Sequence, residues 1–118
     1  TGAKFALENN LNNVAFLRTR IDFIEHCFTQ NEVDEIWITF PDPQPQKPRA
    51  RMRLTNPIFL ERYRKILNPE GKIYLKTDST FLYDYTLDVI KENNFNLFLS
   101  YFSIFCCNKY LTASRIDN

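Results

Sequence analysis

One carboxylate in this chain stands out for chemistry, because Asp42 lies between two prolines in Phe40-Pro41-Asp42-Pro43. The preceding residues 36–40 form a β-branched and aromatic run, which predicts a short buried strand. Neither proline can donate a hydrogen bond to a sheet, so the strand is expected to end here, and Pro43 disfavours a helical Asp42. The carboxylate is therefore expected just beyond a strand end, where ligands bind in open α/β sheets. The alternative is that Asp42 only caps a turn.

A basic segment follows the carboxylate, and no acidic residue occurs between Asp42 and Glu61. We call residues 47–53 the basic arm, because a basic side chain occupies every second position of it: Lys47, Arg49, Arg51 and Arg53. In an extended chain, which rises ~3.3 Å per residue, alternate side chains share one face. Such a row suits the phosphates of a nucleic acid, and arginine also makes bidentate contacts with phosphate or with guanine edges. The alternative is a solvated surface loop.

The composition of the chain limits the classes of protein to which it can belong. Its 118 residues suffice for one domain at most, and 15 basic against 14 acidic residues make the basic character local. No apolar run reaches the ~20 residues that span a bilayer, and the first residues lack a signal-peptide pattern, so a cytoplasmic protein without a membrane segment is expected. The cysteines, Cys27, Cys106 and Cys107, have neither disulfide-framework nor metal-ligand spacing. We therefore expect reduced thiols and no metal site.

Helical and strand patterns alternate along the chain. Helical patterns cover residues 1–10, 21–28, 57–67 and 81–90, and strand patterns cover residues 14–17, 36–40, 73–75 and 95–105. Asn56 is the expected N-cap of the third helix, with Pro57 first. The apolar stripe of this helix is expected to consist of Phe59, Leu60, Tyr63, Ile66 and Leu67. Residues 68–71 are predicted to form a turn. This order predicts parallel strands with right-handed crossovers. His26 has no partner at a metal-binding or catalytic spacing and is expected on the surface of its helix or half-buried.

Three motifs in order carry a resemblance to a known family. Phe40-Pro41-Asp42-Pro43, the basic stretch ending in Arg53-Leu54-Thr55, and Lys76-Thr77-Asp78 after the next strand resemble the bacterial tRNA (guanine-N7-)-methyltransferase family, over roughly residues 5–102. The resemblance implies an α/β, Rossmann-like S-adenosylmethionine-dependent methyltransferase fold with a mostly parallel sheet. It also implies S-adenosyl-L-methionine as cofactor and tRNA as partner, with methylation of N7 of guanine 46 in the variable loop. The protein is expected to be a monomer or a homodimer.

The resemblance gives Asp42 a role in catalysis and in cofactor binding. Guanine N7 has a nucleophilic lone pair, so the enzyme mainly has to align N7, methyl and sulfur in a line. The purine gains positive charge during transfer, and a carboxylate beside it would stabilise that charge. Arg20 and Ile21 fall where many relatives have an acidic residue near the adenine, so they are the expected cofactor contacts, through the backbone or a neighbouring residue.

The same resemblance implies a set of substrate contacts. Gln46 falls where the family has a substrate-contacting lysine, and Lys47 beside it is the expected substitute. The rest of the basic arm is expected to hold tRNA phosphates. Thr77 and Asp78 are expected to contact the guanine or the tRNA, and the alternative for Asp78 is that it caps the helix that follows.

The chain lacks a feature with which nucleotide-cofactor folds normally begin. It has two glycines, Gly2 and Gly71, and neither lies in a glycine-rich turn after a strand. We therefore expect residues 1–118 to form a single partial methyltransferase domain, the second half of the fold, incomplete at the N-terminus and inactive alone. Residues 106–118 do not resemble the family's threonine-and-glutamate motif. The alternatives are a non-catalytic RNA-binding fragment, or a methyltransferase for another acceptor, which would also act on 7-deazaguanine.

Overall fold

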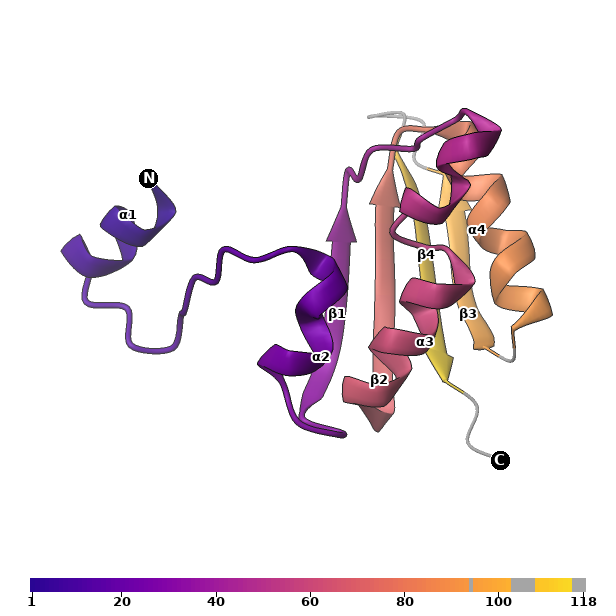
Figure 1. Cartoon of the computed structure of the whole chain (residues 1–118). Coiled ribbons are helices and arrows are strands. Elements are labelled where there is room, and N and C mark those ends of the chain that lie inside the picture. The colour runs from indigo at the N-terminus through magenta and orange to yellow at the C-terminus, as the bar shows by residue number, and fades with distance from the viewer. Residues whose placement is uncertain (94, 103–107, 116–118) are drawn as a thin grey trace.

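The computed structural model describes residues 1–93, 95–102 and 108–115. They include one mixed sheet with helices on one face, and an N-terminal helix that lies apart from the sheet (Figure 1). The strands are β1 (Val33–Thr39), β2 (Leu67–Thr77), β3 (Phe95–Phe102) and β4 (Lys109–Arg115). The α-helices are α1 (Gly2–Glu8), α2 (Ile24–Cys27), α3 (Pro57–Ile66) and α4 (Thr80–Glu92), and the 3₁₀ helices are η1 (Ile21–Phe23) and η2 (Lys47–Met52).

The strand order is β1-β2-β4-β3, and among the described strands only β1 and β2 are parallel neighbours. β4 lies between β2 and β3 and is antiparallel to both. β1, β2 and β3 therefore point in the same direction, but the prediction that neighbouring strands are parallel throughout the sheet is wrong. A parallel neighbour needs a crossover of about a dozen residues or more, and only residues 103–108 separate β3 from β4. The sequence patterns did not predict β4. The predicted α/β class is confirmed.

α3 and α4 pack on one face of the sheet and enclose the core (Figure 1). Burial alternates along β2, so that Ile73, Leu75 and Thr77 face the helices while the residues between them are half-exposed. The predicted stripe of the third helix is confirmed, because Phe59, Leu60, Tyr63 and Ile66 are all buried. Its cap is also confirmed: the Asn56 side chain accepts a hydrogen bond from the Ile58 amide at 2.8 Å.

Two predicted strands differ from the structure. Residues 14–17 form no strand, and Val14, Phe16 and Leu17 are exposed, because no described strand lies beside them to complete the hydrogen bonds. β1 exists but is not the buried strand that its composition predicts, since only Ile38 is buried and Trp37 is 58% exposed. The helices that pack on the sheet lie on one face of it (Figure 1), so the other face of β1, which carries Trp37, is left open. The second helical pattern is divided into η1 and α2.

The predicted turn at residues 68–71 lies inside β2 as a bulge. Two steps along β1, from Val33 to Glu35, are matched by five steps along β2, from Leu67 to Lys72. Asn68 accepts a hydrogen bond from the Glu70 amide at 3.0 Å, which is the expected turn chemistry. A Cβ atom on Gly71 would lie 2.6 Å from the Leu67 side chain and 2.8 Å from the Asp34 carbonyl oxygen, so only glycine fits this approach.

Candidate functional site

Asp42 lies just beyond the carboxyl end of β1, as predicted. The Phe40 amide still donates to the Lys76 carbonyl at 2.8 Å, and the backbone then takes left-handed φ angles of 49° at Phe40 and 46° at Gln44. Asp42 is exposed, and its Oδ1 accepts a hydrogen bond from the Gln44 amide at 3.0 Å. One Asp42 oxygen thus caps a turn, as the alternative predicted. Within the described residues no group donates a hydrogen bond to the second Asp42 oxygen, Oδ2.

Asp78 lies at the same edge of the sheet. Thr39 of β1 pairs with Lys76 of β2, so the segments that carry Asp42 and Asp78 leave adjacent strands together. Thr77 is buried, and its hydroxyl accepts from the Ser79 amide at 3.1 Å. Ser79 caps α4 by accepting from the Leu82 amide at 3.1 Å. The capping alternative for Asp78 is therefore wrong, and its carboxylate is exposed.

The basic arm is not extended. Lys47–Met52 form η2, with Pro48 in its first turn, where the fixed φ of proline suits a helix. A 3₁₀ helix has three residues per turn, so side chains two positions apart point in directions about 120° apart around its axis. The prediction that the basic side chains share one face is therefore wrong. Gln46, Lys47, Arg49 and Arg51 are exposed, and their proposed tRNA contacts stay predictions.

Arg53 differs most from expectation, because its residue is only 6% exposed. Its Nε donates to the Gln44 carbonyl at 3.0 Å, and its Nη2 donates to the Pro45 carbonyl at 3.5 Å. The guanidinium also lies 4.7 Å from the ring centre of Phe81 and 4.6 Å from that of Tyr85. The structure contradicts an exposed Arg53 in a row of phosphate ligands, and the sequence gives no local sign of the two rings far along the chain.

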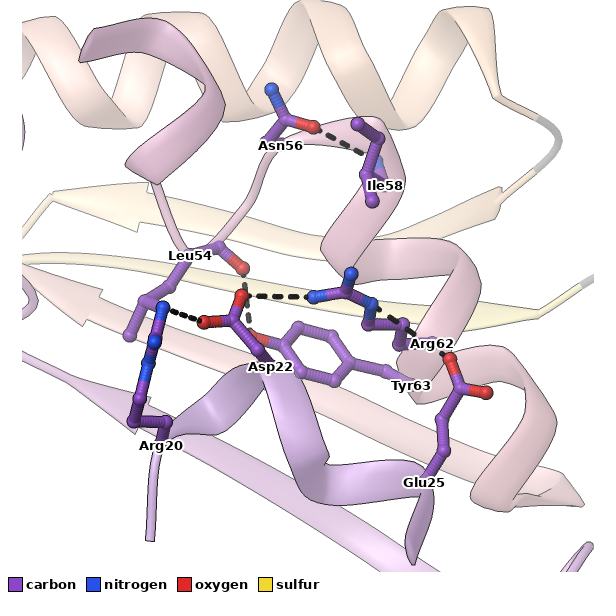
Figure 2. Close-up of polar contacts among 8 residues, drawn as sticks. All are labelled: Arg20, Asp22, Glu25, Leu54, Asn56, Ile58, Arg62 and Tyr63. Carbon is purple, nitrogen blue, oxygen red and sulfur yellow. Dashed lines mark hydrogen bonds and ion pairs between the residues drawn. The ribbon is translucent and has the colours of Figure 1, made fainter.

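A second group of charged residues joins η1 and α2 to α3 (Figure 2). Asp22 accepts from Arg20 at 2.7 Å and from Arg62 at 3.1 Å. Arg62 also lies 3.8 Å from the Glu25 carboxylate. Spacing could not have revealed this network, because Asp22 and Arg62 are 40 positions apart. The network fixes the start of η1, where the predicted cofactor contacts Arg20 and Ile21 lie.

The same segment borders a hollow of about 600 Å³. Its polar lining comes from Arg20, Asp22, Arg51 and Arg62, and apolar side chains from η1, α3 and the end of the basic arm complete it. The hollow thus brings Arg20 and Ile21 together with Arg51. The strand-end group, Asp42, Gln46, Thr77 and Asp78, does not line it. The predicted site residues are therefore divided between this hollow and the surface formed by the strand ends and η2.

Other predicted features concern metals, cysteines and the membrane. In the described part of the chain, no three His, Cys, Asp or Glu side chains form a group that could hold a metal ion. No described helix is long and apolar enough to cross a membrane. His26 is exposed on α2, as expected, and so is the Cys27 thiol. Cys106 and Cys107 lie outside the described residues.

Comparison with known proteins shows the family. The signature of the family described as "Putative methyltransferase" matches residues 3–103. The chain belongs to this methyltransferase family. It is 49% identical over 104 residues to the tRNA (guanine-N(7)-)-methyltransferase of Christiangramia forsetii, and the matched segment covers 88% of this chain and 46% of that protein. It is 54% identical over 93 residues to the protein of the same name from Bacteroides thetaiotaomicron, covering 79% and 36%. The chain thus spans less than half the length of these relatives.

The fold of this family member has also been seen in a solved structure. The crystal structure of a SAM dependent methyltransferase from Aquifex aeolicus matches with a TM-score of 0.72 at 12% identity, over 97% of this chain and 61% of that one. At such identity the match concerns the fold alone, and it confirms the predicted Rossmann-like methyltransferase fold. The limits of the domain stay a prediction.

Proposed function

We propose that this chain forms part of a tRNA (guanine-N7-)-methyltransferase, which transfers a methyl group from S-adenosyl-L-methionine to N7 of guanine 46 in the tRNA variable loop. The observation that carries the proposal is 54% identity over 93 residues with a relative of that name. Because these relatives are more than twice as long as the matched segment, the activity is proposed for an enzyme of that length. It would act in the cytoplasm, as a monomer or a homodimer.

Asp42 is the proposed catalytic residue. When bound, S-adenosyl-L-methionine supplies a methyl group on a positively charged sulfur, which keeps the electrons of the broken S–C bond. Guanine N7 uses its own lone pair, so no residue takes a proton and the purine becomes the cation. An exposed carboxylate beside the purine would stabilise this charge and accept hydrogen bonds from guanine N–H groups. One Asp42 oxygen accepts a hydrogen bond from the Gln44 amide, and the second oxygen is available for the purine, which supports this role.

The hollow beside η1 is the proposed place for part of the cofactor. Its volume of about 600 Å³ suits a small-molecule site, and its mixed lining offers apolar surface for an adenine ring with polar groups beside it. Ile21 and the backbone at Arg20 are the proposed adenine contacts, with Asp22 as the neighbouring carboxylate. Since neither glycine lies in a glycine-rich turn, the chain supplies only part of the pocket.

The exposed basic side chains are the proposed tRNA contacts. Lys47, Arg49 and Arg51 would bind phosphates from different sides of η2, so the strand must curve around this helix rather than follow a straight row. Gln46 or Lys47 takes the role of the family lysine. Asp78 would make a second contact with the guanine or the tRNA, and buried Thr77 would contribute through its backbone.

The second candidate function is that of a non-catalytic fragment that binds RNA and has no cofactor site. The same exposed side chains of η2 support it, and so does the sequence, which lacks the glycine-rich turn. It predicts tRNA binding without affinity for S-adenosyl-L-methionine.

The test uses a hybrid enzyme, in which this chain replaces the matching segment of the Christiangramia forsetii relative. We expect the hybrid to methylate tRNA, and to lose activity when the target guanine is replaced by 7-deazaguanine, which has no N7. Transfer to the 7-deaza substrate would indicate another acceptor atom. A folded hybrid that binds tRNA but transfers no methyl group would favour the RNA-binding candidate.

A further inference from the structure

We propose that Arg53 is a positioning residue that holds Asp42 in place, and that it does not bind tRNA phosphate. The inference rests on the proposed function, because it concerns how the proposed catalytic carboxylate is held. It separates Arg53 from Lys47, Arg49 and Arg51, whose side chains lie on the surface.

The surroundings of the guanidinium keep Arg53 away from a phosphate. The residue is 6% exposed, and its charge lies over the nearly parallel rings of Phe81 and Tyr85 on α4. An arginine against aromatic faces is favoured when it is shielded from water. A phosphate could reach this group only by displacing both rings or the loop above it.

The donors of Arg53 are aimed at the loop that carries Asp42. Nε donates to the Gln44 carbonyl at 3.0 Å and Nη2 to the Pro45 carbonyl at 3.5 Å. On the other side of the same residue, the Gln44 amide donates to Asp42 Oδ1 at 3.0 Å. Gln44 therefore connects the guanidinium to the catalytic carboxylate through one amino acid.

Gln44 needs such support. Its φ of 46° lies in the left-handed region, which is unfavourable for a residue with a side chain. Contacts from both sides keep it there. Without Arg53, Gln44 can relax to a negative φ, and its amide then turns away from Asp42. Lysine cannot replace the arginine, because one ammonium group lacks the planar fork that reaches two carbonyls and stacks on the rings.

The main experiment is a double-mutant cycle in the hybrid enzyme, with Arg53→Gln, Asp42→Ala and both together. Arg53→Gln should lower kcat at least tenfold, and Arg53→Lys should not restore it. In the Asp42→Ala background the same change should lower the remaining rate less than twofold, because its effect passes through Asp42. Full additivity of the two losses would overturn the proposal.

The salt dependence of tRNA binding separates positioning from phosphate binding. Arg49→Gln, the matched control on the exposed part of the arm, should reduce the slope of log affinity against log salt by about one unit, and Arg53→Gln should leave the slope unchanged. A slope reduced in Arg53→Gln as in the control would identify Arg53 as a phosphate ligand. It would also sink the positioning role.

A measurement on the chain itself is independent of the methyltransferase activity. In the 118-residue chain, the Gln44 amide should exchange slowly with deuterium, because it donates a hydrogen bond to Asp42 Oδ1. In Arg53→Gln, with the exchange of the sheet amides unchanged, the Gln44 amide should exchange at least tenfold faster. Equal exchange rates in both proteins would refute the positioning role even if the hybrid is inactive, whereas an inactive hybrid with the predicted change in exchange would refute only the proposed reaction.

Discussion

The Asp22 carboxylate accepts a hydrogen bond from Arg62 at 3.1 Å, and this contact ties the start of η1 to the middle of α3 across 40 positions of the sequence. Both side chains are partly exposed, at 34% and 28%, so the ion pair itself contributes only about 0–1 kcal/mol to stability. Its importance lies in its place, because both residues border the hollow proposed for the cofactor.

Arg62→Gln in the hybrid enzyme is therefore expected to raise the KM for S-adenosyl-L-methionine several-fold with little change in kcat. The cause is the loss of the contact that holds Asp22 and the Arg20 segment. Steady-state kinetics at saturating tRNA measures the effect. Lys65→Gln is the control, because Lys65 is on the same helix as Arg62 and lies near Glu25 of α2, but does not line the hollow. Equal effects of the two changes would contradict a specific role of Arg62.

Asp42→Ala should lower methyl transfer by the hybrid by two orders of magnitude or more, while the thermal unfolding midpoint stays nearly unchanged. An exposed loop carboxylate contributes little to packing, but it is the proposed partner of the positive purine. Asp84→Ala, on the exposed side of α4, should leave the rate unaltered. Near-normal turnover of Asp42→Ala would remove Asp42 from the mechanism.

Neutralising Lys47, Arg49 and Arg51 together should weaken tRNA binding strongly at low salt. The slope of log affinity against log salt should fall by about three, roughly one for each phosphate contact. Affinity for the cofactor is expected to fall only slightly, because Arg51 alone of the three borders the hollow. Fluorescence anisotropy across a salt series gives the slope. An unchanged slope would mean that η2 is a solvated surface and that tRNA binds elsewhere.

The 118-residue chain alone should bind S-adenosyl-L-methionine poorly, because it contributes the hollow but no glycine-rich turn. Calorimetric titration should give no saturation at cofactor concentrations that saturate the hybrid. Tight binding with one cofactor per chain would show that the pocket is complete without the remainder of the fold.

Because of Tyr63, the free energy of unfolding of the chain should decrease at alkaline pH. Burial raises the pKa of Tyr63 above its usual value near 10, an effect that the charge of Arg62 partly opposes. Because the unfolded chain releases this proton first, the stabilisation is complete below about pH 10 and is lost above it, by up to ~1.4 kcal/mol for each pH unit. Urea unfolding at pH 9–11 measures this loss.

Tyr63→Phe is the matched variant for that series. It loses the hydrogen bond to the Leu54 carbonyl, which costs about 1 kcal/mol at neutral pH, but its stability should fall less steeply above pH 10. Parallel curves for the two proteins would show that Tyr63 does not titrate differently on unfolding.

The sequence could predict those features that depend on neighbouring residues. The cap at Asn56, the stripe of α3 and the end of β1 before Asp42 follow from local preferences, and each was confirmed. The prediction of an extended basic arm was wrong, because alternating charges are compatible with an extended chain and with a 3₁₀ helix. The structure shows the helix, with Pro48 in its first turn and the buried Arg53 just after its end.

Features that depend on distant residues could not be predicted in this way. The burial of Arg53 requires Phe81 and Tyr85, about 30 positions further along the chain. The contact of Asp22 with Arg62 and the pairing of β4 with β2 likewise join segments that no local pattern relates. Residues 14–17 show the converse, since a suitable composition makes no strand without a neighbour.

The position of β1 at the end of the strand order also affects how the isolated chain behaves in solution. Among the described residues only β2 pairs with it, so one row of its backbone N–H and C=O groups faces solvent beside the exposed Trp37 ring. Such an edge is a template for the same strand of another molecule. We therefore expect concentrated samples of the isolated chain to associate edge to edge, and a charged substitution on β1 to reduce this association.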